Sequence, residues 1–214
     1  MNFIKTFIDF ILHLDTHLSA LVAQFGSGTY VILFFIVFAE TGLVVAPFLP
    51  GDSLLFAAGT FAAIGSLNVF VLIIVLIIAA VLGDAVNYSV GKYLGKNLIE
   101  KHDKIIKKEY LDKTHSFYEK YGKKTIVLAR FVPIVRTFAP FVAGIGKMRY
   151  IEFLTYNIIG GILWVVSLVL LGFYFGNIPI VKENFTIAIL VIIFLSFLPA
   201  IIEFWKHHRK KLSK

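Results

Sequence analysis

The chain has 214 residues, of which 58% are hydrophobic and only 16% are charged. Soluble domains carry about 25% charged residues, and a soluble core of this size could not hide so much apolar surface from water. The formal net charge of +8 does not indicate nucleic-acid binding, because the basic residues gather in short segments between apolar stretches, as they do in cytoplasmic loops of membrane proteins.

The first predicted element is an amphipathic helix within residues 1–28. Apolar side chains recur there at helical spacing, between charged residues such as Lys5 and Asp9. This pattern is typical of a helix that lies in the membrane interface. A helix that packs against the rest of the bundle would show the same pattern, and both alternatives stay open.

Residues 30–64 are predicted to form a re-entrant helical hairpin. The stretch is apolar but contains Glu40, Pro50, Gly51 and Asp52. Proline removes a backbone donor and breaks a helix, and broken backbone at membrane depth survives only inside protein or beside a water-filled cavity. We therefore expect the chain to enter and leave the membrane here on the same face.

A transmembrane helix is predicted over residues 67–91, because its apolar run exceeds the roughly 20 residues that a helix needs to cross a bilayer. The end of this span carries Asp84, Asn87 and Tyr88. We favour helix packing and hydrogen bonding to a neighbouring segment for these side chains. Ligand binding is the alternative.

A second re-entrant hairpin is predicted over residues 125–146, which contain Arg130, Pro133, Arg136 and Pro140. Basic segments flank it on both sides. Because basic loops mark the cytoplasmic side, a segment between two such loops must enter and leave on one face.

The remaining segments follow from charge and hydropathy. Residues 96–124 are predicted to be a charged cytoplasmic linker, either solvated or with a basic aromatic face on anionic headgroups. Residues 152–176 are predicted to span the membrane. Residues 177–214 are expected to form a last transmembrane helix and a basic tail, with the C-terminus in the cytoplasm.

The two halves of the chain resemble each other. Phe48-Leu49-Pro50 matches Phe131-Val132-Pro133, and Gly91-Lys-Tyr93-Leu-Gly95 matches Gly172-Phe-Tyr174-Phe-Gly176, each about 80 residues apart, which indicates an internal repeat. The predicted units are 29–95 and 125–176, and they face opposite sides of the membrane. The expected fold is therefore an all-α membrane protein built from an inverted repeat of re-entrant hairpin plus transmembrane helix.

Four charged residues in apolar surroundings, Glu40, Asp52, Arg130 and Arg136, are the candidate functional residues. Each costs about 2.5–3.5 kcal/mol at a helix centre, so they must pair, reach water or become neutral. Arginine offers a planar fork of donors that suits phosphate, and a buried carboxylate is a candidate proton carrier. Two structural alternatives remain: salt bridges that lock the hairpins together, and a helix-capping role for Asp52.

The order of these motifs resembles the bacterial DedA family, which shares the SNARE-associated or VTT domain with eukaryotic lipid scramblases. The resemblance covers residues 30–176 and rests on the residues Glu40, Asp52, Gly83, Asp84, Tyr88, Gly91, Lys92, Arg130, Pro133, Arg136, Pro140, Ala143 and Gly144. It implies a lipid-translocating protein in which Arg130 and Arg136 bind a headgroup phosphate and Glu40 and Asp52 couple transport to protons. Family members have been linked to recycling undecaprenyl phosphate, and others to moving phosphatidylethanolamine.

From the residues and the resemblance together we expect a carrier for an anionic lipid in a bacterial cytoplasmic membrane, with undecaprenyl phosphate as the favoured substrate. The alternatives are a phosphatidylethanolamine translocase or scramblase, a proton-coupled ion or drug antiporter, and a membrane assembly factor that transports nothing. We expect no enzymatic activity, cofactor or metal, since the histidines complete no ligand set and no phosphate-binding loop is present. A homo-oligomer is left open.

Overall fold

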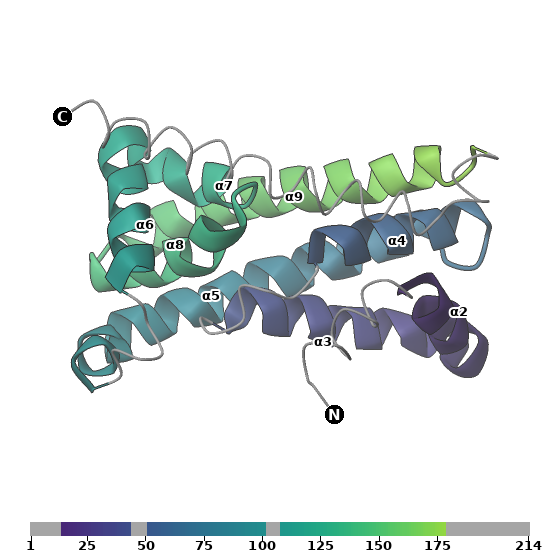
Figure 1. Cartoon of the computed structure of the whole chain (residues 1–214), viewed down its shortest axis with the longest axis horizontal. Helices are drawn as coiled ribbons and strands as arrows, with labels where there is room; N and C mark the ends of the chain where they lie inside the picture. Colours follow the sequence, from purple (N-terminus) through teal and green to yellow (C-terminus); the bar gives the residue numbers. More distant parts are fainter. Residues whose placement is uncertain (1–13, 44–50, 102–107, 179–214) are drawn as a thin grey trace, which may run out of the picture.

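The computed structural model describes residues 14–43, 51–101 and 108–178. Every regular element in these ranges is a helix, which confirms the all-α prediction. The elements are α2 (Leu14–Phe25), η1 (Gly26–Gly28), α3 (Thr29–Gly42), α4 (Gly51–Ala63), α5 (Val69–Lys101), α6 (Lys108–Tyr121), η2 (Gly122–Lys124), α7 (Thr125–Ala129), α8 (Pro133–Ile145) and α9 (Tyr150–Phe175) (Figure 1). Pro50 and the predicted last transmembrane helix lie outside the described residues.

Three helical stretches in the described part are long and apolar enough to cross a membrane: Thr16–Gly42, Val69–Gly95 and Tyr150–Phe175. The last two coincide with the predicted spans, although α5 continues to Lys101. The first joins the predicted N-terminal helix to the first arm of the predicted hairpin. It is interrupted at Gly26, whose φ of 53° is a left-handed conformation that glycine adopts without strain.

The two predicted hairpins each contain two helices, α3 with α4 and α7 with α8. Helix α3 ends at Gly42 and α4 begins at Gly51, with 44–50 outside the described residues, and three residues separate α7 from α8. Pro133 is the first residue of α8, where its missing N–H removes no helical hydrogen bond. Pro140, which was counted among the helix breakers, lies inside α8, and the helix continues to Ile145.

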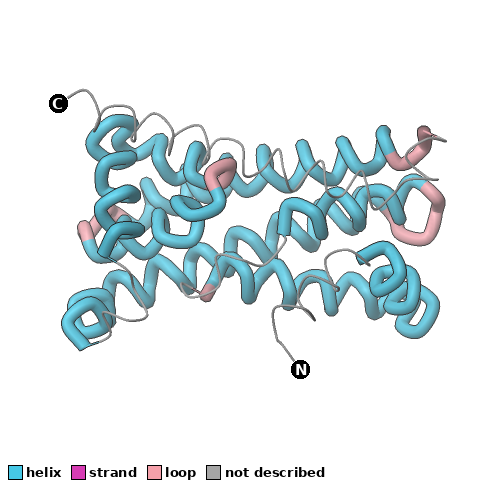
Figure 2. Tube along the Cα trace, in the orientation of Figure 1, coloured by secondary structure: helices cyan, strands magenta, loops and turns pink. Residues whose placement is uncertain are grey.

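The two helix pairs enter the bundle from opposite ends. Figure 2 shows the loop from α4 to α5 at one end of the molecule and the loop from α8 to α9 at the other. This arrangement agrees with the internal repeat that the sequence indicates. It brings the consecutive helix ends of each pair, which carry the predicted charges, to the same level of the bundle.

The short helices α4 and α8 each pack closely against the long helix of the other half of the chain, α4 against α9 and α8 against α5. At Gly59 of α4 a Cβ atom would lie 2.2 Å from the Val169 carbonyl oxygen of α9, and at Gly172 of α9 it would lie 2.0 Å from the Phe56 oxygen. Only glycine permits this approach of the two backbones. The contact fixes α4 against α9.

The same contact occurs between α8 and α5. A Cβ atom at Gly91 would lie 2.1 Å from the Phe141 carbonyl oxygen, and one at Gly144 would lie 2.2 Å from the Tyr88 oxygen. The repeated glycines of the sequence therefore make equivalent helix crossings, and the two halves are interlocked rather than side by side.

The predicted charged linker 96–124 contains a helix, α6, among its described residues. Its helix α6 buries Thr114 completely, and the Tyr118 hydroxyl donates a hydrogen bond of 2.9 Å to the Ala139 carbonyl of α8. Burial raises the pKa of the Tyr118 phenol, so it remains a neutral donor. Through this hydrogen bond α6 supports α8.

Candidate functional site

Arg136 links the two halves of the molecule. It lies one turn into α8, and one of its terminal nitrogens donates to the Oδ1 atom of Asp52 at 2.7 Å. Its other terminal nitrogen donates to the Oε1 atom of Glu40. The guanidinium therefore bridges two carboxylates, Glu40 of α3 and Asp52 of α4, with charge-assisted hydrogen bonds.

Glu40 is almost fully buried, with 1% of its surface exposed. Its Oε1 atom also accepts a hydrogen bond of 3.2 Å from the backbone N–H of Gly51, the first residue of α4. A carboxylate at this position satisfies a free N–H and interacts favourably with the helix dipole. A Cβ atom at Gly51 would lie 1.8 Å from the Glu40 Oε2 atom, so a larger residue there would force the Glu40 carboxylate to shift.

Asp52 lies in the first turn of α4, where capping of that helix was the structural alternative. Its Oδ1 atom instead receives the Arg136 donor and the indole N–H of Trp164, the latter at 2.9 Å. The carboxylate is therefore bound by side chains of the second half, and Glu40 accepts the N–H at the start of α4.

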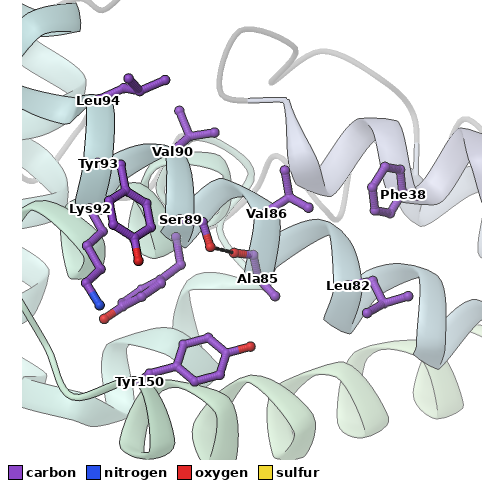
Figure 3. A pocket seen from close by; sticks show the side chains of 11 residues that line it. Phe38, Leu82, Ala85, Val86, Ser89, Val90, Lys92, Tyr93, Leu94 and Tyr150 are labelled. Carbon is purple, nitrogen blue, oxygen red and sulfur yellow. Dashed lines mark hydrogen bonds between the residues drawn. The ribbon is translucent and has the colours of Figure 1, made fainter.

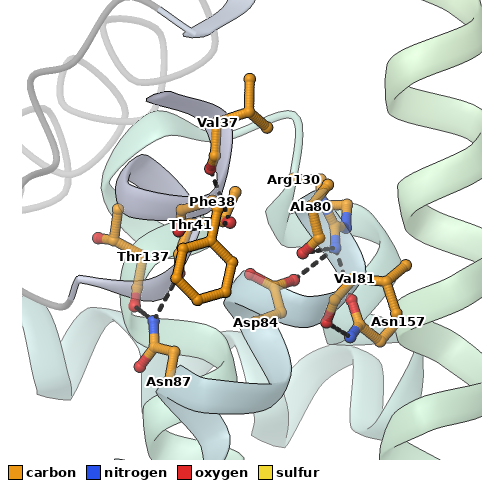
Figure 4. Close-up of polar contacts among 10 residues, drawn as sticks. All are labelled: Val37, Phe38, Thr41, Ala80, Val81, Asp84, Asn87, Arg130, Thr137 and Asn157. Atoms are coloured by element: carbon orange, nitrogen blue, oxygen red, sulfur yellow. Dashed lines mark hydrogen bonds and ion pairs between the residues drawn. The ribbon is translucent and has the colours of Figure 1, made fainter. Parts of the chain in front are cut away.

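Arg130 forms a separate buried ion pair with Asp84. One terminal nitrogen lies 2.5 Å from the Asp84 Oδ2 atom and 2.5 Å from the Asn157 Oδ1 atom of α9 (Figure 4). The Asn157 amide in turn donates to the Val81 carbonyl at 3.0 Å. Asp84, expected to act in packing, is thus the counter-ion of a predicted functional arginine.

Trp164 of α9 lies next to both arginines. The centre of its ring is 5.8 Å from the guanidinium carbon of Arg130 and 5.3 Å from that of Arg136. Both distances fall within the range of a cation–π interaction. One aromatic ring therefore joins the two ion-pair groups into a single cluster, which we call the central cluster: Glu40, Asp52, Asp84, Arg130, Arg136 and Trp164.

Asn87 holds the elements around this cluster together. Its amide nitrogen donates to the Thr41 carbonyl of α3 at 3.2 Å and to the Thr137 carbonyl of α8 at 2.8 Å (Figure 4). The neighbouring Tyr88 hydroxyl donates to the Met148 carbonyl. Asn87 and Tyr88 thus link α5 to α3, to α8 and to the loop that follows α8.

The cavity at the central cluster is small. Its volume is about 10 Å³, enough for at most one water molecule, and Glu40, Thr41, Asp84, Arg136 and Thr137 contribute to its lining. A phosphate group does not fit. The hydrated pocket expected from the sequence is therefore not open in this conformation. The arginine N–H groups donate to the carboxylates of the cluster instead.

Three polar atoms of the site have no hydrogen-bond partner among the described residues: Glu40 Oε2, Asn87 Oδ1 and Arg130 Nε. Buried polar atoms are normally satisfied, and exceptions gather at functional sites. In the described ranges no cluster of three His, Asp or Glu side chains has the arrangement of a metal site.

The sequence identified four of the six members of the central cluster as functional residues. The geometry adds Asp84, which the sequence assigned to packing, and Trp164 with its neighbour Asn157, which it did not single out. Asp84 could have been found by the argument applied to Glu40, since it is equally costly inside an apolar helix. Asn157 and Trp164 carry no charge, so a search for charged residues passes over them.

Comparison with known proteins identifies relatives along nearly the whole chain. Residues 49–174 match the VTT domain. The chain is 55% identical to Protein DedA of Escherichia coli over 98% of its own length and 97% of that protein, and 44% identical to an uncharacterized membrane protein of Mycobacterium tuberculosis over 87% and 83%. It is 36% identical to the inner membrane protein YqjA of E. coli over 71% and 69%. No solved structure gives a significant match.

Proposed function

Because this chain belongs to the DedA family of VTT-domain membrane proteins, we propose that it moves the phosphate headgroup of an anionic lipid between the leaflets of a bacterial inner membrane, coupled to protons. Undecaprenyl phosphate is the favoured substrate, because a phosphate monoester without a cationic partner suits two arginines. The lipid tail stays in the bilayer while the headgroup passes the central cluster.

The observation that carries this proposal is the position of Arg136. It is buried between the two halves, and both of its terminal nitrogens bind carboxylate oxygens. Carboxylate and phosphate oxygens compete for the same donor geometry. Glu40 and Asp52 therefore occupy the sites that a phosphate takes when the cluster opens.

Proton coupling follows from the charges of the central cluster. Its three carboxylates face two guanidiniums, so one negative charge is in excess. A phosphate next to Glu40 and Asp52 would be repelled while both are ionised. Proton uptake by these carboxylates frees Arg136 and removes the repulsion, and proton release on the other side restores the internal ion pairs.

The proposed topology follows from the same arrangement. The helix pairs α3–α4 and α7–α8 are re-entrant hairpins that enter from opposite faces, and α5 and α9 span the membrane. In this view the central cluster lies near the middle of the bilayer, where inverted-repeat transporters bind their substrates. The C-terminal tail is placed in the cytoplasm.

One observation favours a second candidate, a proton-coupled antiporter for a small ion. The cavity of about 10 Å³ admits an ion or a water molecule without a large opening. The same carboxylates would then carry protons against the ion. This candidate needs no contact with lipid headgroups, and a transport assay separates the two.

The test is a headgroup translocation assay in proteoliposomes. Undecaprenyl phosphate is incorporated in both leaflets, and a membrane-impermeant phosphatase is added outside, so that complete hydrolysis requires translocation. We expect Glu40→Gln, which keeps shape but cannot ionise, to reduce the rate at least about tenfold, the equivalent of one charge-assisted hydrogen bond. Phosphatidylethanolamine with an impermeant amine reagent tests the rival lipid.

Lys124→Gln is the matched control, because Lys124 is exposed and lies outside the cluster. Wild-type translocation by both Glu40→Gln and Arg136→Lys would remove the proposed roles of the cluster. Proton-dependent ion flux without movement of either lipid would establish the antiporter instead.

A further inference from the structure

A groove of about 810 Å³ lies on the surface of α5, away from the small central cavity. It runs along one side of α5, between Phe38 of α3 and Tyr150 of α9 (Figure 3). Most of its walls are apolar side chains such as Leu82 and Val86. Leu82 and Val86 are 46% and 44% exposed, so this part of the groove is open to the surrounding lipid.

The two ends of the groove differ in chemistry. Figure 3 shows Phe38 and Leu82 at one end, and Lys92 and Tyr93 at the other. Lys92 lies three residues before the end of the Val69–Gly95 span, where lysine side chains reach the headgroup level. The Tyr93 ring is 74% exposed and lies 5.4 Å from the Lys92 ammonium.

None of the ion pairs among the described residues involves Lys92. A cation at the boundary of an apolar groove is suited to an anionic group attached to a hydrocarbon chain. Phosphate accepts hydrogen bonds from an ammonium and from phenol hydroxyls alike. The charge and the shape of the groove therefore fit one kind of ligand, an apolar chain with a phosphate group at the Lys92 end.

We propose that this groove is a lateral binding site for a membrane lipid with a phosphate headgroup, held at the headgroup by Lys92 and Tyr93 and along its chain by Leu82 and Val86. The inference rests on the proposed function and extends it: the lipid binds in the groove before its headgroup enters the central cluster.

The same two helices, α3 and α5, contribute to the apolar end of the groove and to the central cluster. Phe38 is two residues before Glu40, and Leu82 is two residues before Asp84. The helices α3 and α5 touch here, because the Phe38 carbonyl would lie 2.8 Å from a Cβ atom at Gly83. Separation of α3 from α5 at this contact opens a path from the groove to Arg136.

The test uses a single-chain alkyl phosphate with a photoreactive diazirine in its chain, added to the purified full-length protein in lipid nanodiscs. Labelled residues are mapped by mass spectrometry. We expect labelling at Leu82, Val86 and their groove neighbours. Lys92→Gln should reduce it at least about tenfold, since a charged hydrogen-bond partner is lost, and Val86→Trp should abolish it by filling the groove.

Two matched variants control for surface effects. Val71→Trp places the same ring on the exposed side of α5 outside the groove, where Val71 is 43% exposed, and Lys124→Gln removes an exposed lysine elsewhere. Both should be labelled like the wild type. The corresponding alkyl alcohol should label weakly, and inorganic phosphate should compete poorly because it lacks the chain.

Equal labelling of Val86→Trp and wild type, or equal labelling by the alcohol and the phosphate, would overturn the groove site. Full competition by inorganic phosphate would also overturn it, since the ligand would then be free phosphate. These outcomes are separate from the proposed function, because translocation that depends on Glu40 and Arg136 would persist without a groove site.

Discussion

Arg136 and Glu40 are 96 positions apart in the chain and form a buried ion pair between α8 and α3. The pair joins the second hairpin to the first, and Asp52 completes it from α4. Because these partners belong to different halves of the repeat, any relative movement of the halves must break or exchange these contacts. The ion pairs therefore hold the two halves together, and in the proposed function they are the groups that a substrate replaces.

Loss of Arg136 should destabilise the protein strongly. Arg136→Ala leaves Glu40 and Asp52 buried without a counter-charge, and removal of one partner from a buried pair costs about 3–5 kcal/mol. We expect the triple variant Arg136→Ala, Glu40→Gln, Asp52→Asn to recover most of the loss. Thermal unfolding in detergent measures this, and a triple variant no more stable than Arg136→Ala would argue against a charge effect.

Substitutions of the Arg130–Asp84 pair can distinguish a structural role of this pair from a role in transport. Asp84→Leu alone should destabilise by about 3–5 kcal/mol, whereas the double variant Asp84→Leu, Arg130→Met should regain most of this stability through apolar packing. The double variant should nevertheless fail to translocate lipid. A double variant that is stable and also transports at the wild-type rate would leave the pair with a packing role only.

Gly51→Ala tests the geometry of the cluster without changing any charge. The added Cβ atom would lie 1.8 Å from the Glu40 Oε2 atom, so the carboxylate must move away from Arg136. We expect a loss of about 1–3 kcal/mol, as for other overpacked sites, together with slower translocation. Gly28→Ala is the control, because its Cβ would meet its nearest neighbour at an ordinary 3.5 Å; equal unfolding temperatures of the two variants would contradict the account.

Trp164→Phe removes one hydrogen bond from Asp52 but keeps an aromatic ring beside the arginines. The loss should be about 0.5–1.5 kcal/mol, the net contribution of one hydrogen bond. Trp164→Leu also removes the cation–π contacts and should lose more. Unfolding of the two variants side by side provides the measurement, and identical stabilities would mean that the ring face contributes nothing.

Much of the site could be predicted from the cost of charge in an apolar segment. This argument selected Glu40, Arg130 and Arg136. Glu40 and Arg130 are buried and the Arg136 side chain is only 9% exposed, and each of the three is paired with an opposite charge, as an apolar interior requires. The repeated glycines likewise predicted an internal repeat. They did not show that α4 packs on α9 and α8 on α5, because a glycine in the sequence does not reveal which helix it contacts.

The remaining features depend on three-dimensional contacts. Asp84 and Asn157 become site residues only through their distance from Arg130, and Trp164 only through its place between two guanidiniums. The volume of the central cavity is set by side-chain packing, which composition does not encode. For Pro140 the general rule that proline breaks a helix does not hold, because this proline lies inside α8 and the helix continues past it.

The most direct test of the account is whether the central cluster opens to water on both sides of the membrane. The natural chain contains no cysteine, so Thr137→Cys, at a buried position that lines the central cavity, can be probed with an impermeant thiol reagent applied from either face of a proteoliposome. The account predicts labelling from each face, with the favoured face reversing when the proton gradient is reversed. The buried Ala58→Cys, outside the cavity lining, should stay unlabelled. Labelling of Thr137→Cys from one face only, whatever the gradient, would contradict it.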